Sequence, residues 1–227
     1  MKKILFILLS ALPLFAGFFP ATSNTTVSSV NQETVTLASP FAVRGMSGIV
    51  MHNFDNGIKA ATHSVISTSS ATEATLTDAD TIHHDNLPSI KTAIAVGDQV
   101  IGGYLYENVL VIAPNAETYS KIVSSYNKNW MHPDIYAQFL SRLGDNTPNK
   151  ENLKQFAQEK QVGLIYIVQK EYSILFDPIS GQIVAQKESD ATSSELKYPF
   201  FMRLNNLKSG WFSGDAKGDY YKAVGSL

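Results

Sequence analysis

Short hydrophobic stretches separated by turn-forming residues run from residue 40 to residue 104, a pattern that is typical of β-strands. Residues 48–53 and 58–67 flank Asp55-Asn56-Gly57, and this combination predicts a β-hairpin. Further strands are expected at 72–76, 91–96 and 99–104. Strands of this length and spacing predict a small β-rich, barrel-like unit over residues 40–104, preceded by an extended lead-in or edge strand at 24–39.

From residue 105 to residue 188 the pattern changes to continuous hydrophobic runs with helical periodicity between them. Val109–Ile112 and Leu164–Val168 are runs typical of strands buried on both faces. Three helices are expected between them, starting near Asn115, Pro133 and Thr147. Because helices join the two strands, a parallel crossover is expected, and a hairpin over 172–177 and 182–187 would add antiparallel strands. We therefore predict an α+β fold, in which the barrel-like unit is followed by an α/β unit with a mixed sheet and about three helices.

The chain is expected to end in a polar linker and an aromatic segment, which together cover residues 189–227. The large rings of this segment and of the helical region before it are Trp130, Tyr136, Tyr198, Phe200, Phe201, Trp211, Phe212, Tyr220 and Tyr221. They have two interpretations. They can be core side chains that hold a Gly-rich tail against the domain, or an exposed strip for a protein partner, since Trp and Tyr are enriched at interfaces.

Residues 1–23 have the pattern of an export signal. Two lysines precede a hydrophobic run from Ile4 to Phe19, and the small residues of Ala21-Thr22-Ser23 predict cleavage after Ser23. An uncleaved membrane anchor is the alternative, but the run is shorter than the roughly 20 apolar residues of a spanning helix. The mature chain is therefore expected in the periplasm or at the cell surface, with no transmembrane helix.

Composition narrows the classes of function. The chain has no cysteine, which excludes disulfides, a thiol nucleophile, thiolate zinc sites and an acylated lipoprotein cysteine. Its 18 basic and 20 acidic residues give a net charge of −2, and removal of the two lysines of the export signal leaves 16 against 20, or −4. The lysines are scattered, so nucleic acid is not expected as a partner. A hydrophobic fraction of 44% indicates a folded globule.

Catalytic and metal-binding motifs are weak in this sequence. His83-His84-Asp85, with His52 or His63, could form a metal site, but adjacent histidines in an extended segment point to opposite faces. We expect a solvated loop there, and no metal or cofactor. The sequence also lacks a serine nucleophile elbow, a phosphate loop and a dinucleotide fingerprint. A non-enzymatic protein is therefore expected; a zinc enzyme would require bound metal that His83→Ala and His84→Ala abolish.

Five segments carry a resemblance to a known family: Leu110–Asn115, Val162–Val168, Pro199–Arg203, Trp211–Gly214 and Asp219–Ala223. In their order and spacing they resemble the N-terminal domain of the PgbA-like plasminogen-binding proteins of a group of Gram-negative bacteria. The resemblance covers most of residues 40–225. It implies an exported protein of the cell envelope that binds host plasminogen.

The resemblance also implies a chemistry for this binding. Kringle domains of plasminogen pair the ammonium of a lysine with acidic side chains and enclose its stem with aromatic rings, so C-terminal lysines bind best. The family's long Lys-rich tail is not present in this sequence, but an internal lysine flanked by acidic residues can imitate a terminal one. The candidate partner-binding residues are Asp215, Lys217, Asp219, Lys222, Trp211 and Phe212.

A second hypothesis is a periplasmic scaffold in an envelope complex, for example a motor-associated one. It is motivated by the missing Lys-rich tail and by the lack of a sequence signal for outer-membrane attachment. Cell fractionation separates the two hypotheses, because a protein retained in the periplasm cannot meet host plasminogen.

Overall fold

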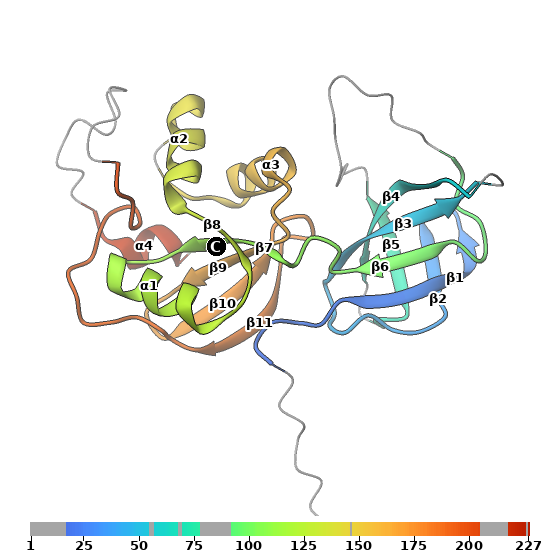
Figure 1. The fold of residues 1–227 in the computed structure, drawn as a ribbon, viewed down its shortest axis with the longest axis horizontal. Coiled ribbons are helices and arrows are strands. Elements are labelled where there is room, and N and C mark those ends of the chain that lie inside the picture. Colours follow the sequence, from blue (N-terminus) through green and yellow to red (C-terminus); the bar gives the residue numbers. More distant parts are fainter. Residues whose placement is uncertain are drawn as a thin grey trace, which may run out of the picture.

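A computed structural model describes residues 17–54, 57–67, 70–77, 92–145, 147–204, 218–225 and 227. Within these residues the chain forms a closed β-barrel followed by a mixed β-sheet with helices on both faces (Figure 1). The predicted fold class is confirmed.

The barrel consists of short antiparallel strands whose inward-facing side chains are small and mostly β-branched. Its strands are β1 (Ser23–Asn31), β2 (Thr34–Leu37), β3 (Ser47–Asn53), β4 (Lys59–Ser67), β5 (Glu73–Thr77) and β6 (Gln99–Gly102), in the order β1-β2-β5-β4-β3-β6. The buried interior includes Val27, Val35, Val50, Val65, Ala74 and Val100. Because these side chains pack against one another, the barrel has a filled core.

The barrel differs from the prediction at two places. Residues 24–39 lie largely in β1 and β2, which pair with each other. The expected strand at 91–96 is not formed over residues 92–95; instead β6 pairs with β1 and β3. The reason is local. Asp98 Oδ2 accepts a hydrogen bond from Ala95 N–H (2.9 Å) and Gly97, at φ 97°, donates to the Val27 carbonyl (2.9 Å), so this stretch turns beside β1.

The second unit is a five-stranded sheet in the order β11-β10-β9-β7-β8. Its strands are β7 (Asn108–Ile112), β8 (Asn129–Met131), β9 (Leu164–Val168), β10 (Tyr172–Asp177) and β11 (Gln182–Glu188). β7 pairs in parallel with β8 and β9, whereas β10 pairs antiparallel with β9 and β11. The predicted crossover and hairpin are therefore present. β8, which has three residues, was not predicted.

Helices cover both faces of this sheet. They are α1 (Ala116–Ser125), α2 (Pro133–Leu143), α3 (Lys150–Lys160) and α4 (Tyr220–Val224). α1 packs on the face whose core continues into the barrel, and α2, α3 and α4 pack on the opposite face. Their ends follow capping chemistry: Asn115 accepts a hydrogen bond from Thr118 N–H, and Gly144 ends α2 in the left-handed conformation.

Asp177, at the end of β10, joins the sheet to the barrel. The side chain is fully buried. Its Oδ2 accepts hydrogen bonds from Ser47 N–H (2.8 Å), at the start of β3, and from the Tyr106 hydroxyl (2.7 Å). Its Oδ1 accepts from the N–H groups of Ile179 (2.9 Å) and Ser180 (3.0 Å). One carboxylate therefore fixes the hairpin turn after β10 and the first residue of a barrel strand together.

Candidate partner-binding surface

Helix α4 carries two of the predicted partner-binding residues and is held against the sheet by Tyr220. The Tyr220 hydroxyl lies 2.7 Å from the carbonyl oxygen of Val168 and 3.0 Å from that of Ile112, the last residues of β9 and β7. It donates its single proton to one of them at a time. Tyr220 and Val224, one helical turn apart, are both buried. α4 is thus a docked element, although it has only five residues.

The docking of α4 fills the edge of the sheet at which α/β proteins commonly bind ligands, the carboxyl ends of the parallel strands. Tyr220 occupies this position at β7 and β9. Burial strongly raises the pKa of its phenol, so the hydroxyl is a neutral hydrogen-bond donor. The arrangement here is suited to fixing a helix and not to proton transfer.

The outer side of α4 is charged. Asp219 caps the helix by accepting a hydrogen bond from Tyr221 N–H (2.9 Å), and both Asp219 and Lys222 are exposed. Residues three positions apart at the start of a helix lie on one side of it, so this acid and this lysine share a face. The other predicted residues, Asp215, Lys217, Trp211 and Phe212, lie outside the described residues, and their role stays a prediction.

The turn between β9 and β10 lies beside α4 and adds charges that sequence reasoning missed. The Gln169 side-chain amide donates a hydrogen bond to the Val224 carbonyl (3.2 Å). Lys170 and Glu171 follow directly and are exposed. We call the exposed residues Asp219, Lys222, Lys170 and Glu171 the α4 surface. The sequence indicates that this turn is polar. Its position beside α4 follows from the docking of Tyr220, a contact between distant residues that no local sequence pattern indicates.

Residues 197–203 form a strap that leads toward α4 along the end of β7. Lys197 N–H donates to the Pro114 carbonyl (2.7 Å), and Phe201 N–H donates to the Ala113 carbonyl (2.8 Å). Arg203 then donates to Asp134 at the start of α2, through its backbone N–H (2.7 Å) and through Nε (2.9 Å). The strap is therefore a fixed part of the domain as far as Arg203.

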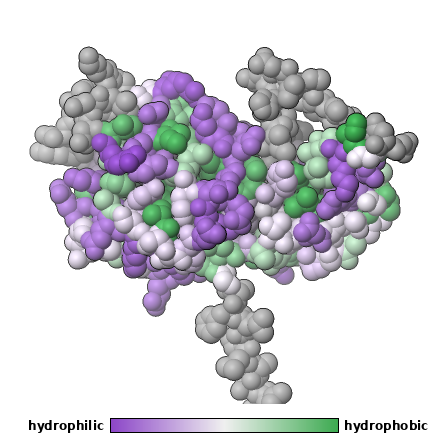
Figure 2. All heavy atoms as spheres, viewed as in Figure 1, coloured by the Kyte–Doolittle hydropathy of each residue, from purple (hydrophilic) through white to green (hydrophobic). Residues whose placement is uncertain are grey.

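The predicted aromatic set is divided between core and surface. Tyr136, Phe200 and Tyr220 are buried in the core beneath α2 and α3. Trp130, Phe201 and Tyr221 are partly exposed. On the face shown in Figure 2, hydrophilic residues separate small hydrophobic areas. A partner on this face would consequently meet hydrophilic as well as hydrophobic side chains.

Lys187 and Asp190 form a half-buried ion pair among tyrosines on the α1 side of the sheet. Lys187 Nζ lies 2.9 Å from Asp190 Oδ2 and donates to the Tyr126 hydroxyl (3.0 Å). Burial opposes the charged form of Asp190, but hydrogen bonds from Tyr166, Lys187 and Ser173 outweigh it and lower the pKa of this carboxyl. Hydrogen bonds to Tyr126 and Asp190 raise the pKa of Lys187 against the effect of burial.

The stability of the protein should depend on the charge of Asp190. Because its pKa is lowered on folding, its contribution is present above the ordinary value of about 3.9 and is lost as the pH falls through the folded-state pKa. We expect Asp190→Asn to flatten the fall in the free energy of unfolding between about pH 5 and pH 2, measured by urea denaturation. Glu188→Gln, at an exposed acid nearby, serves as control and should keep the wild-type slope. Equal slopes in Asp190→Asn and wild type would contradict this assignment.

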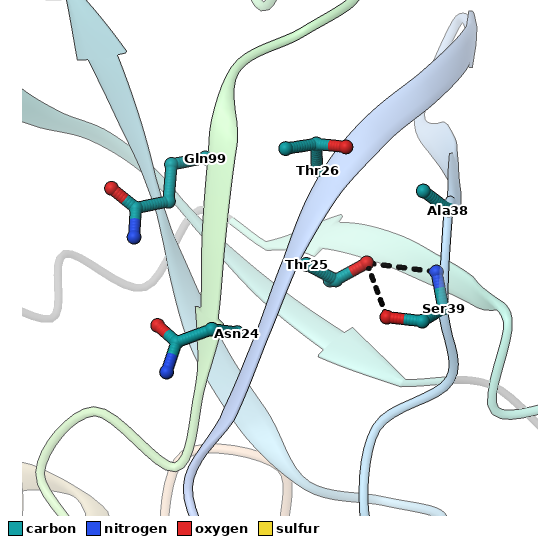
Figure 3. A pocket seen from close by; sticks show the side chains of 6 residues that line it. All are labelled: Asn24, Thr25, Thr26, Ala38, Ser39 and Gln99. Carbon is teal, nitrogen blue, oxygen red and sulfur yellow. Dashed lines mark hydrogen bonds between the residues drawn. The ribbon is translucent and has the colours of Figure 1, made fainter.

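The barrel bears a pocket of about 440 Å³ lined by Asn24, Thr25, Thr26, Ala38, Ser39 and Gln99 (Figure 3). The Thr25 hydroxyl oxygen accepts a hydrogen bond from Ser39 N–H (2.8 Å) and lies 3.0 Å from Ser39 Oγ. Its lining contains no ionisable side chain, so these residues offer no carboxylate, imidazole or ammonium group for acid–base chemistry.

The histidines that suggested a metal site are dispersed where the structure describes them. His52 Nδ1 forms a hydrogen bond with Asp98 (2.8 Å) inside the barrel unit, while His83, His84 and Asp85 lie outside the described ranges. Across those ranges, no three His, Cys, Asp or Glu side chains could hold a metal ion. Nor do the same ranges contain a helix with the length and hydrophobicity needed to cross a membrane.

Comparison with known proteins finds one family over nearly the whole chain. The family model described as "Plasminogen-binding protein pgbA N-terminal" matches residues 22–224. Two curated proteins named Plasminogen-binding protein PgbA, from Helicobacter pylori strains J99 and 26695, are each 26% identical, over 154 and 148 residues. The aligned parts are 65% and 63% of this chain but 34% and 32% of those proteins, so the chain spans about a third of their length. No solved structure matches it significantly.

Proposed function

Because the chain belongs to the family of the N-terminal domain of plasminogen-binding protein PgbA, we propose that it is an exported, non-enzymatic domain that binds host plasminogen. The proposal includes export through the N-terminal signal to the cell envelope, with exposure to the outside of a Gram-negative cell. The observation that carries it is the α4 surface, where Lys222 and Asp219 stand exposed on a helix that Tyr220 fixes to the sheet.

The chemistry of the α4 surface suits a lysine-binding partner. Lys222 and Lys170 each offer an ammonium group, and Asp219 and Glu171 place a carboxylate close to each lysine in the sequence. A kringle that accepts an internal lysine needs such a neighbouring negative charge in place of the C-terminal carboxylate. We propose Lys217 and Asp215 as further contacts, with Trp211 and Phe212 as apolar contacts beside them.

Two ionisable side chains in the interior of the described fold support the non-enzymatic part of the proposal. Asp177 accepts four hydrogen bonds from within the fold, and Lys187 is held by Asp190 and Tyr126. A general base or a nucleophile must be free to meet a substrate atom. These groups are instead committed to structural contacts.

Single lysines of the α4 surface should each contribute little to the affinity. An exposed ion pair is worth about 0 to 1 kcal/mol, so Lys222→Ala is expected to weaken plasminogen binding about two- to fivefold. Replacing Lys170, Lys217 and Lys222 together should weaken it at least about tenfold. Surface plasmon resonance with immobilised plasminogen measures both, and a free lysine analogue should compete with the wild-type protein.

The matched control is Lys121→Ala, at an exposed lysine of α1 on the opposite face of the sheet. It should bind plasminogen as the wild type does. Wild-type affinity in the triple variant, or binding that a lysine analogue does not reduce, would contradict the proposed site. Fractionation tests the remaining part: retention in the periplasm within a complex of the cell's own proteins would instead support the scaffold hypothesis.

A further inference from the structure

Phe18 and Phe19, which lie in the hydrophobic run of the export signal, are part of the folded domain. Phe18 packs edge to face on Tyr166 of β9, with ring centroids 5.3 Å apart. Phe19 meets Tyr126 at 5.0 Å and Trp130 at 6.1 Å, also edge to face. Both rings are half-buried and belong to the core cluster that runs from the α1 face of the sheet into the barrel. We call these two residues the aromatic anchor.

Charged side chains strengthen the aromatic anchor. Lys187 Nζ lies 4.9 Å from the ring centroid of Phe18, and Lys128 Nζ lies 5.0 Å from that of Phe19. Ammonium groups over aromatic faces are attracted to them, most strongly where water is partly excluded. Phe18 therefore lies against the lysine of the Lys187–Asp190 ion pair, on the same face of the sheet as α1.

The chain between the aromatic anchor and β1 bridges the two units. Phe18 and Phe19 contact the sheet, and Ser23 already pairs with Gly102 in the barrel. Figure 1 shows this segment in blue, passing beside β11 on its way to the barrel. The Ser23 hydroxyl oxygen also accepts a hydrogen bond from Ala42 N–H (2.8 Å). A cut after Ser23 would remove the aromatic anchor and both contacts of Ser23.

We propose that the exported chain is cut after Ala16 or Gly17, so that the mature protein keeps the aromatic anchor; this rests on the proposed export. The stretch from Ile4 to Phe15 has a length within the roughly 7 to 15 residues of a signal-peptide hydrophobic region, and Ala16 and Gly17 are the small residues that follow it directly. Ala21 and Ser23 fit the usual spacing of small residues at a cleavage site better. The packing of Phe18 and Phe19 on the folded domain is the reason to propose the earlier cut.

The reaction is hydrolysis of one peptide bond by the signal peptidase of the cell. Water adds across the bond: the leader leaves with a new carboxylate on Ala16 or Gly17, and the mature chain begins with a new α-ammonium group on Gly17 or Phe18. The enzyme needs small side chains next to the cut. Large substitutions at Ala16 and Gly17, or at Ala21 and Ser23, therefore distinguish the proposed cut from a cut after Ser23.

The test is N-terminal sequencing and intact mass of the protein purified from the cell envelope. We expect an N-terminus at Gly17 or Phe18. Replacing Ala16 and Gly17 together by leucine should cause the unprocessed precursor to accumulate. The matched control, with Ala21 and Ser23 replaced by leucine, should be cut at the same place as the wild type.

The possible outcomes separate the cut site from export itself. An N-terminus at Asn24, or loss of processing in the control variant alone, would overturn the cut site while leaving export intact. A chain that keeps Met1 in the cytosol would overturn the cut site together with the proposed export.

Stability provides a second readout, because the exported protein contains the aromatic anchor only if it is cut before Phe18. Phe18→Ala combined with Phe19→Ala should lower the Tm of the exported protein by about 5 to 10 °C, because two half-buried rings are lost. Tyr104→Ala, at an aromatic side chain that is 43% exposed, should shift the Tm by less than about 3 °C. An unchanged Tm in the double variant would overturn the role of the aromatic anchor.

Discussion

Asp177→Ala is expected to lower the free energy of unfolding by about 3 to 5 kcal/mol. The substitution leaves the buried hydrogen-bond donors of Ser47, Tyr106 and Ile179, and the partly buried donor of Ser180, without their acceptor. An unsatisfied buried donor costs about 1 to 3 kcal/mol, and the costs of donors that share one acceptor group are not additive. Burial raises the pKa of the Asp177 carboxyl, and hydrogen bonds from Ser47, Ser180 and Tyr106 oppose that effect. Urea denaturation followed by circular dichroism measures the loss.

Two further variants show whether the hydrogen bonds of Asp177 or only its volume matter. Asp177→Asn keeps the shape of the side chain but replaces one acceptor oxygen by an NH₂ group. In either orientation of the amide, this NH₂ group faces a backbone N–H, that of Ser47 or that of Ile179, so the variant should be nearly as destabilised as the alanine variant. Tyr106→Phe removes one donor and leaves the carboxylate three, and should cost only about 1 to 2 kcal/mol. Wild-type stability in Asp177→Asn would refute the proposed importance of this carboxylate.

Tyr220→Ala is expected to cost about 3 to 5 kcal/mol, the usual range for truncating a large buried ring. The ring is fully buried under α4, and its hydroxyl meets the last carbonyl groups of β7 and β9. Tyr220→Phe keeps the ring but leaves those carbonyls without this donor, so a smaller loss of about 1 to 2 kcal/mol is expected. Thermal unfolding with calorimetry gives both values.

Tyr221→Ala is the matched control for Tyr220. Its side chain is the next tyrosine of α4 and is partly exposed, so its removal should cost less than about 1 kcal/mol. Because α4 presents Lys222, Tyr220→Ala should also reduce plasminogen binding, whereas Tyr220→Phe should retain it. Similar losses of stability for the two alanine variants would mean that Tyr220 does not dock the helix as described.

Local sequence patterns predicted most of the fold. Asn115 and Pro133 marked helix starts because the residues at the start of a helix act through neighbouring backbone groups. The hairpin of β10 and β11 was predicted from two short segments, 172–177 and 182–187, joined by the turn residues Pro178-Ile179-Ser180-Gly181. The runs at Val109 and Leu164 became the central parallel pair, because strands covered on both faces need hydrophobic residues at every position.

What the sequence did not reveal depends on contacts between distant residues. In the sequence, Asp177 is an acidic residue next to a turn with no special pattern around it. Its hydrogen bond with Ser47, 130 positions earlier, exists only in the folded protein. From the sequence alone, Tyr220 could equally be a surface residue, and Phe18 and Phe19 belong to the hydrophobic run of the export signal. The burial of all three rings depends on the assembled sheet, so no local pattern predicts it. For the candidate site, Asp219 and Lys222 were predicted from the lysine chemistry that the family resemblance implies, whereas Lys170 and Glu171 were added only because their turn lies beside the docked α4.

The position of the Tyr220 hydroxyl has a mechanical consequence. If a partner pulls on α4, the load passes through Tyr220 into the ends of β7 and β9, which are interior strands of the sheet. Those strands are paired along both sides, so several hydrogen bonds would have to shear together before either one moves. Tension at this helix would therefore be resisted by the middle of the sheet.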